Sequence, residues 1–149
     1  MQTQELLERI AALLKVSLQD LLMEETDPQE AVAYYRTEVE DGLAEAKDAV
    51  AKAVAQERHI AKQLGAAESS AAEWDARVDV ALQAGDDARA RAALRRKASY
   101  ECAAQGLQAK LDHHRQVLAD MKASVSALQE KIKDLEGLGK PSRSGSRPS

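Results

Sequence analysis

Between residues 28 and 136 the chain contains a single turn signal, the sequence Ala84-Gly85-Asp86-Asp87. Glycine accepts the positive φ that ends a helix, and an aspartate after it caps the first turn of the next helix. Apolar residues on either side recur at helical spacing without another break. Because a lone helix of this kind is only marginally stable, each must pack against a partner. The feature predicts two long helices, 28–84 and 87–136, paired as an antiparallel hairpin.

The two predicted arms carry matching apolar stripes, which we call the seam. On the return arm the stripe alternates by four and three residues from Ala93 to Leu135, which is the coiled-coil pattern. The outgoing arm has the same alternation from Leu64 to Ala81 and an eleven-residue repeat over 32–61. A turn at Gly85 then pairs the stripes residue by residue. The principal predicted seam residues are Leu43, Val50, Leu64, Trp74, Val78, Leu107, Leu111, Leu118, Met121 and Leu128.

The same register places two polar pairs across the seam. Glu57 faces His114, and Trp74 faces Lys97. A carboxylate opposite an imidazole favours a hydrogen bond, and an ammonium group over an indole ring favours a cation–π contact. We predict both contacts as a test of the register.

A strong helix-start signal precedes the hairpin. Asp27 is placed to cap the helix, Pro28 takes its first position, and Glu30 completes a capping box. Residues 2–25 before this signal form a further predicted helix. The chain is therefore expected to be all-α, with three parts: an amphipathic helix at 1–26, the hairpin at 27–136 and a basic tail at 137–149.

The tail is rich in glycine, proline and serine and carries Lys140, Arg143 and Arg147 without an acid. Such a composition buries too little apolar surface to offset the entropy of ordering, so we predict disorder after residue 136. Gly137 is expected to end the last helix. Gly42, Gly65 and Gly106 lie inside periodic patterns and are interpreted as tolerated helix residues.

The N-terminal segment carries one continuous apolar stripe, which we call the leucine stripe. Two interpretations stay open: the stripe packs on the hairpin or on a second copy, or it lies in the plane of a membrane interface. Residues 1–25 hold five acids and two bases, so anionic lipid would repel them and binding would rest on apolar burial. The predicted membrane-binding residues are Leu6, Leu7, Ile10, Leu13, Leu14, Leu18, Leu21 and Leu22.

Charge and composition exclude several classes of function. The 149 residues carry a formal net charge of −4, which argues against nucleic acid as the main partner. The chain has no phosphate-binding glycine loop or nucleophile motif, so no enzyme and no cofactor are expected. His59, His113 and His114 would point in different directions, and no metal site is expected from them. The single Cys102 fits a reducing compartment.

One local basic cluster lies just after the predicted turn and consists of Arg89, Arg91, Arg95 and Arg96. Such a run is usually a solvated helix face, and a contact with an acidic partner is the alternative. The chain shows no secretory signal and no apolar run of about 18 residues that would span a membrane. Any contact with a membrane is therefore expected to be peripheral.

Two blocks of sequence resemble the family of phage-shock protein A and the plastid vesicle-inducing proteins, which are bacterial relatives of ESCRT-III. The first block is Glu25-Thr26-Asp27-Pro28-Gln29-Glu30-Ala31-Val32 with Glu38-Val39-Glu40-Asp41-Gly42-Leu43. The second is Trp74 followed by Ala81-Leu82-Gln83-Ala84-Gly85-Asp86-Asp87-Ala88-Arg89-Ala90-Arg91-Ala92-Ala93-Leu94, similar to the family's hairpin tip. The resemblance as a whole covers roughly residues 9–136.

The resemblance implies a cytoplasmic protein on the inner face of the cell membrane that responds to envelope stress. It implies membrane binding through the N-terminal helix, oligomers that maintain or remodel the bilayer and, in some members, a hairpin that restrains an AAA+ transcription activator. This chain departs from the pattern at its N-terminus, which lacks the Met-Gly-Phe-like opening, and after the return arm, where the family's C-terminal helices are missing. We therefore expect a short member that does not build large polymers.

The leading hypothesis is a peripheral membrane scaffold. The second is a regulatory coiled coil that binds a protein partner without lipid, and the third is a purely structural coiled-coil dimer.

Overall fold

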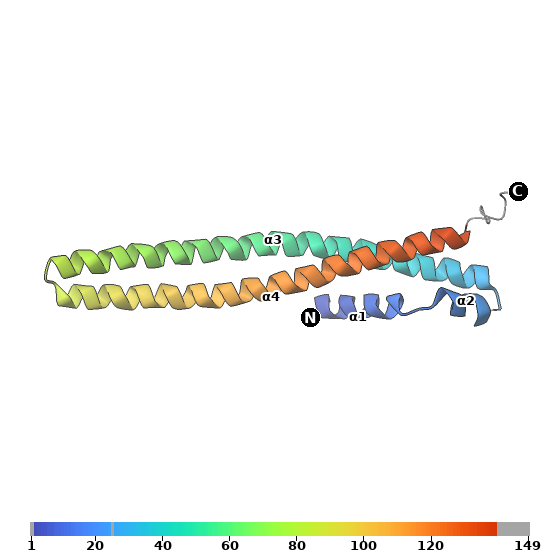
Figure 1. The fold of residues 1–149 in the computed structure, drawn as a ribbon, viewed down its shortest axis with the longest axis horizontal. Helices are drawn as coiled ribbons and strands as arrows, with labels where there is room; N and C mark the ends of the chain where they lie inside the picture. Colours follow the sequence, from blue (N-terminus) through green and yellow to red (C-terminus); the bar gives the residue numbers. More distant parts are fainter. Residues whose placement is uncertain (1, 25, 140–149) are drawn as a thin grey trace, which may run out of the picture. The chain divides into compact units, whose positions relative to one another are not determined.

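The fold was obtained as a computed structural model that describes residues 2–24 and 26–139. The described residues form four helices: α1 (Gln2–Leu14), α2 (Leu18–Glu24), α3 (Pro28–Gln83) and α4 (Asp87–Gly139). α3 and α4 run antiparallel from the turn that joins them (Figure 1). The predicted all-α antiparallel hairpin is confirmed, and two short helices precede it.

The turn between α3 and α4 is built around Gly85, which has a φ of 72°. The Gly85 amide donates to the Leu82 carbonyl at 3.1 Å, and the Asp86 amide donates to the Ala81 carbonyl at 2.9 Å. This pair of bonds is a Schellman motif, which satisfies the last carbonyls of α3. The Asp86 side chain then caps α4 by accepting from the Arg89 amide at 3.0 Å. The predicted turn is confirmed, and Asp86 is the capping aspartate.

The start of α3 also follows the sequence signal. The Asp27 carboxylate accepts a hydrogen bond from the Glu30 amide at 3.3 Å, and Pro28 is the first helical residue. The first amide groups of a helix lack a partner inside the helix. The Asp27 side chain satisfies one of them, and Pro28 has no amide hydrogen that would need a partner.

The predicted single helix over 2–25 is wrong, because α1 ends at Leu14 and α2 begins at Leu18. The Ser17 hydroxyl accepts from the Asp20 amide at 3.3 Å, so it caps α2. Serine favours this geometry over a helix interior, because its side chain offers the backbone an alternative hydrogen bond.

The prediction that Gly137 ends the last helix is also wrong, since α4 continues to Gly139. A single glycine lowers helix stability without ending a helix that is held by packing. The predicted disorder of residues 140–149 lies outside the described residues.

The chain forms two compact units: unit 1 comprises residues 1–52 and 119–149, and unit 2 comprises residues 53–118. Within unit 2, Ile60, Leu64 and Leu111 form a buried cluster, and Leu107 and Ala104 pack against it. Nearer the turn the buried residues are mostly alanines, which allow α3 and α4 to approach closely. They are Ala71, Ala81, Ala90 and Ala93, together with Val78.

The residues predicted for the seam are all shielded from solvent. Leu43, Val50, Trp74 and Leu107 are half-buried. The rest are buried: Leu64, Val78, Leu111, Leu118, Met121 and Leu128.

The predicted hydrogen bond between Glu57 and His114 is wrong. The Glu57 carboxylate instead pairs with the Arg115 guanidinium at 2.8 Å, and the His114 Nε2 donates to the Ala53 carbonyl at 2.7 Å. A hydrogen bond between a guanidinium and a carboxylate is charge-assisted and is therefore one of the stronger kinds. The longer arginine therefore takes the carboxylate, and the histidine bonds to backbone.

The predicted contact between Trp74 and Lys97 is wrong as well. Two guanidinium groups lie over the indole ring instead, with Arg77 at 4.3 Å and Arg96 at 5.2 Å from the ring centre. Lys97 pairs with Asp75 at 2.9 Å, and that hydrogen bond raises the pKa of Lys97. The planar guanidinium is better suited than an ammonium group to lie over a ring, which leaves the lysine to the nearby carboxylate.

Candidate functional site

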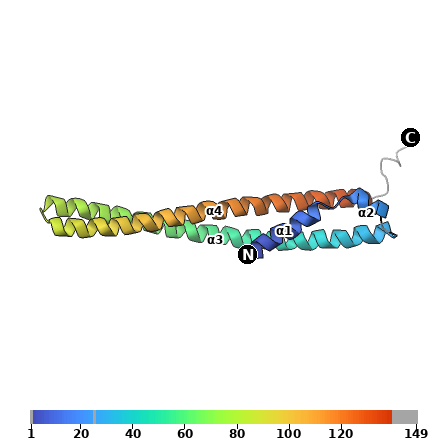
Figure 2. The ribbon, with the colours of Figure 1, turned by 90° about the horizontal axis from the view of Figure 1, so that it is seen from below.

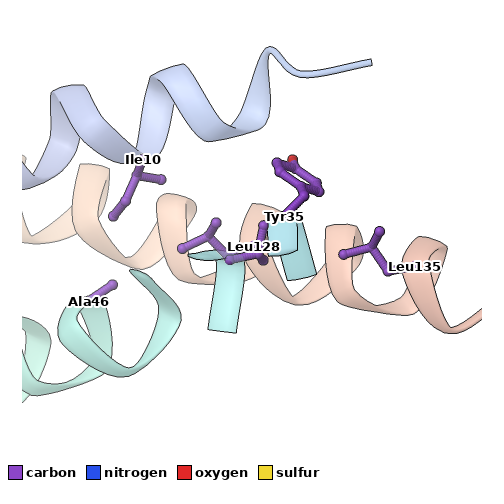
Figure 3. Close-up of a cluster of buried hydrophobic side chains, with 6 residues drawn as sticks. Ile10, Tyr35, Ala46, Leu128 and Leu135 are labelled. Atoms are coloured by element: carbon purple, nitrogen blue, oxygen red, sulfur yellow. The ribbon is translucent and has the colours of Figure 1, made fainter. Parts of the chain in front are cut away.

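The leucine stripe of α1 and α2 lies against α3 and α4 within unit 1. α1 lies beside both helices in Figure 1 and between them in Figure 2. Ile10 is the centre of this contact and is only 1% exposed. It belongs to one buried cluster with Tyr35 and Ala46 of α3 and Leu128 and Leu135 of α4 (Figure 3). Of the two interpretations of the stripe, the structure therefore has the one in which it packs on the hairpin.

The other predicted membrane-binding residues differ in burial. Leu7 is half-buried, and Leu22 is 41% exposed. The remaining ones are partly buried against the same cluster: Leu6, Leu13, Leu14, Leu18 and Leu21. Val16 packs there too and was missed from sequence. In a single continuous helix Val16 would lie off the leucine stripe. Because α1 ends at Leu14, Val16 can instead pack against the cluster.

Two polar contacts fix α1 to α3. The Tyr35 hydroxyl donates at 2.5 Å to the Leu13 carbonyl in the last turn of α1, which also accepts from the Val16 amide at 3.3 Å. Burial raises the pKa of Tyr35. Near the middle of α1, the Arg9 guanidinium pairs with the Glu45 carboxylate, and this hydrogen bond raises the pKa of Arg9.

Gly42 of α3 lies against Leu13 of α1. It is buried, and a Cβ added to it would lie 3.4 Å from the Leu13 Cδ1 and 4.0 Å from the Leu128 Cδ1. A larger side chain would therefore meet Leu13. The sequence pattern gave no sign of this role, because Gly42 looked like any other glycine inside a helix.

A groove of about 650 Å³ lies beside this contact, within unit 1. Its lining combines apolar residues such as Val16 and Leu21 with the acids Glu30 and Glu38. Tyr34 also lines it, and a hydrogen bond to Glu38 raises the pKa of Tyr34.

The predicted partner-contact residues lie on α4 close to the turn, and all four are exposed: Arg89, Arg91, Arg95 and Arg96. A groove of about 430 Å³ opens there between α3 and α4, lined by Trp74, Arg77, Arg89 and several alanines. Three large apolar side chains near this groove are exposed, Val80 at 66%, Leu82 at 56% and Leu94 at 46%. We call this region the tip surface.

Other chemistry is sparse in the part of the chain that the structure describes. Over residues 2–24 and 26–139, no three His, Cys, Asp or Glu side chains are placed to hold a metal ion together. Cys102 is a free thiol on the surface. None of the described helices has a stretch that is long and apolar enough to cross a bilayer.

Comparison with known proteins decides the family. A match to the PspA/IM30 family spans residues 5–137, which include most of α1, all of α2 and nearly all of the hairpin. The chain belongs to the PspA/IM30 family. The resemblance of the Asp27-Pro28 and Trp74–Leu94 blocks is thereby confirmed.

Two relatives of this PspA/IM30 chain are named as membrane-associated proteins, and a third is named as a phage shock protein A homolog. The chain is 31% identical over 127 residues to the chloroplastic membrane-associated protein VIPP1 of Oryza sativa subsp. japonica, covering 85% of this chain and 40% of that protein. It is 30% identical to the membrane-associated protein Vipp1 of Nostoc punctiforme, covering 87% and 50%. The phage shock protein A homolog of Deinococcus radiodurans is 26% identical, with 87% and 58% covered. The chain thus spans about half the length of these relatives.

Proposed function

We propose that the chain is a peripheral membrane scaffold of the envelope stress response, which acts on the cytoplasmic face of the cell membrane to maintain or remodel it. The observation that carries the proposal is the leucine stripe. It lies on two short helices outside the hairpin, joined to α3 by the segment 25–27. Two relatives of this family are named as membrane-associated proteins. The proposed role is binding and scaffolding, without catalysis or a cofactor.

The lipid-contacting residues of the proposal are those of the leucine stripe, from Leu6 to Leu22. On a membrane, α1 and α2 would lie in the interface with these side chains in the acyl region, as amphipathic helices do. The hairpin would stay in water and carry self-association. Because the segment is acidic, we expect stronger binding to neutral than to anionic vesicles.

The test is co-sedimentation of the full chain and of a 25–149 truncation with small, highly curved phosphatidylcholine vesicles. The proposal predicts that only the full chain pellets. A full-length Leu7→Gln/Leu22→Gln variant should pellet less, whereas the matched Leu82→Gln variant, altered at an exposed apolar residue of the tip surface, should pellet like wild type. If the full chain stays in the supernatant, the leucine stripe serves protein contacts only.

A second candidate function is a regulatory module that binds a protein partner, such as an AAA+ transcription activator, without lipid. The tip surface favours it, because exposed apolar side chains next to a cluster of arginines suit an acidic, partly apolar partner. Its test is co-elution of the chain with the purified activator. Binding should be lost in Arg91→Glu/Arg95→Glu and retained in the 25–149 truncation.

A further inference from the structure

Most of the side chains that would enter lipid, with Ile10 at their centre, are covered by α3 and α4 in this structure. Their receiving surface, which we call the base seat, consists of Tyr35, Val39, Gly42, Ala46 and Leu128. We propose that the base seat is an intramolecular docking site that holds α1 closed, so that α1 binds either the seat or lipid and never both. The inference rests on the proposed function and adds its regulation.

The exclusion follows from burial. Ile10 is 1% exposed, and Val39 and Leu128, in the same cluster, are 0% exposed. An isoleucine enclosed in this way has no surface left for an acyl chain. α1 must therefore separate from α3 and α4 before Ile10 can enter a bilayer.

Three contacts give the base seat its specificity for α1. Gly42 lies against the Leu13 side chain, the Tyr35 hydroxyl binds the Leu13 carbonyl, and Glu45 pairs with Arg9. Two of them converge on Leu13, at the C-terminal end of α1. That end is followed by the break at residues 15–17, where the chain can bend without disturbing a helix.

A closed state lowers the apparent affinity for lipid, because the affinity of the open state is multiplied by the fraction of molecules that are open. Any change on the hairpin that weakens the seat must then raise lipid binding, although it alters no lipid-contacting residue. If the contact served only to stabilise the fold, weakening it would not raise lipid binding.

The first experiment uses the full-length Gly42→Leu variant, whose added side chain meets Leu13. The control is Gly65→Leu, because a Cβ at Gly65 has no other atom within 4 Å. Hydrogen exchange without lipid should be faster in residues 2–14 of Gly42→Leu and unchanged in Gly65→Leu. Binding to phosphatidylcholine vesicles should rise about tenfold in Gly42→Leu only. Tyr35→Phe, which removes one hydrogen bond and preserves the ring, should shift both readouts in the same direction by less.

The second experiment closes the seat. In a Cys102→Ser background, Arg9→Cys and Glu45→Cys replace an exposed pair whose side chains touch. A short bis-maleimide joins the two thiols, and a monofunctional maleimide gives the matched open control. The bridged protein should lose vesicle binding, and the control should retain it.

Each experiment has a result that would overturn part of the inference. Equal vesicle binding by the bridged and control proteins would overturn the closed state, as would faster exchange of α1 in Gly42→Leu without a gain in binding. Unchanged exchange in Gly42→Leu would overturn the role of Gly42 in the seat. The 25–149 truncation separates the two proposals. If the truncation binds vesicles as well as the full chain does, the proposed function fails. If only the full chain binds and the bridge has no effect on its binding, the proposed function stands and the inference alone fails.

Discussion

At the scale of single residues, three glycines have three different environments. Gly85 has a positive φ, Gly42 has a neighbouring helix against it, and Gly65 has open space. Only the first was identifiable from sequence, because it lies at the single turn signal. The other two are both helical, and their difference depends on where α1 packs.

Gly85→Ala should destabilise the hairpin by about 1–2 kcal/mol, because an alanine pays a steric penalty at positive φ. Gly65→Ala should stabilise it by roughly 0.5–1 kcal/mol, because alanine is the better helix former and nothing crowds the added methyl group. Urea unfolding followed by circular dichroism measures both. Equal shifts in the two variants would contradict the assignment of the turn.

Tyr35 gives the contact of α1 a pH dependence. Burial raises its pKa above the ordinary value of 10.0, so the contact is fully stable below that pH. It weakens as the pH rises through the raised pKa, because a phenolate cannot donate to the Leu13 carbonyl. Hydrogen exchange of α1 should therefore accelerate more between pH 9 and about 11 in wild type than in Tyr35→Phe. Other groups that ionise in this range, such as Lys97, are common to both proteins and cancel in the comparison.

At the scale of helices, the sequence predicted the helix caps, because a cap depends on residues that are close together in the chain. The caps of α3 and α4 came from aspartates beside proline and glycine, and both are present. The break between α1 and α2 was missed, because Lys15-Val16-Ser17 contains neither glycine nor proline and its leucine spacing continues across it. Ser17 is compatible with a cap and with a helix interior, and packing of Val16 against unit 1 favours the cap.

Ser17→Ala should destabilise α2 by about 1 kcal/mol through the loss of its cap. Hydrogen exchange of residues 18–23 should accelerate, with α1 little changed. The control is Ser69→Ala, an exposed position inside α3, where the expected change is within about 0.5 kcal/mol. Equal protection of α2 in both variants would show that packing alone fixes the break.

At the scale of the whole molecule, the apolar spacing predicted an all-α hairpin and a seam that the structure keeps shielded. It did not identify which partners meet across that seam. The Glu57 and Trp74 contacts were wrong because side-chain length and charge select among neighbours that the register leaves nearly equivalent. The apolar spacing also did not predict where α1 packs, because the same leucine stripe is suited to a protein surface and to a lipid surface.

The two compact units should respond differently to equivalent cavities. Leu128→Ala in unit 1 and Leu111→Ala in unit 2 both remove a buried leucine and should each cost about 2–5 kcal/mol. Only Leu128 belongs to the cluster that holds Ile10. Hydrogen exchange of α1 should therefore accelerate in Leu128→Ala and stay near the wild-type rate in Leu111→Ala, under conditions where both proteins remain folded.

Trp74 is the only tryptophan of the chain, and it lies in unit 2 with the guanidinium groups of Arg77 and Arg96 over its ring. Its intrinsic fluorescence is therefore a local probe of that unit, quenched or shifted when the two guanidinium groups leave the indole. Circular dichroism, in contrast, reports on all four helices. A denaturation curve from emission and one from ellipticity coincide if the units unfold as one cooperative body. If they separate, the emission curve isolates unit 2 without any added label.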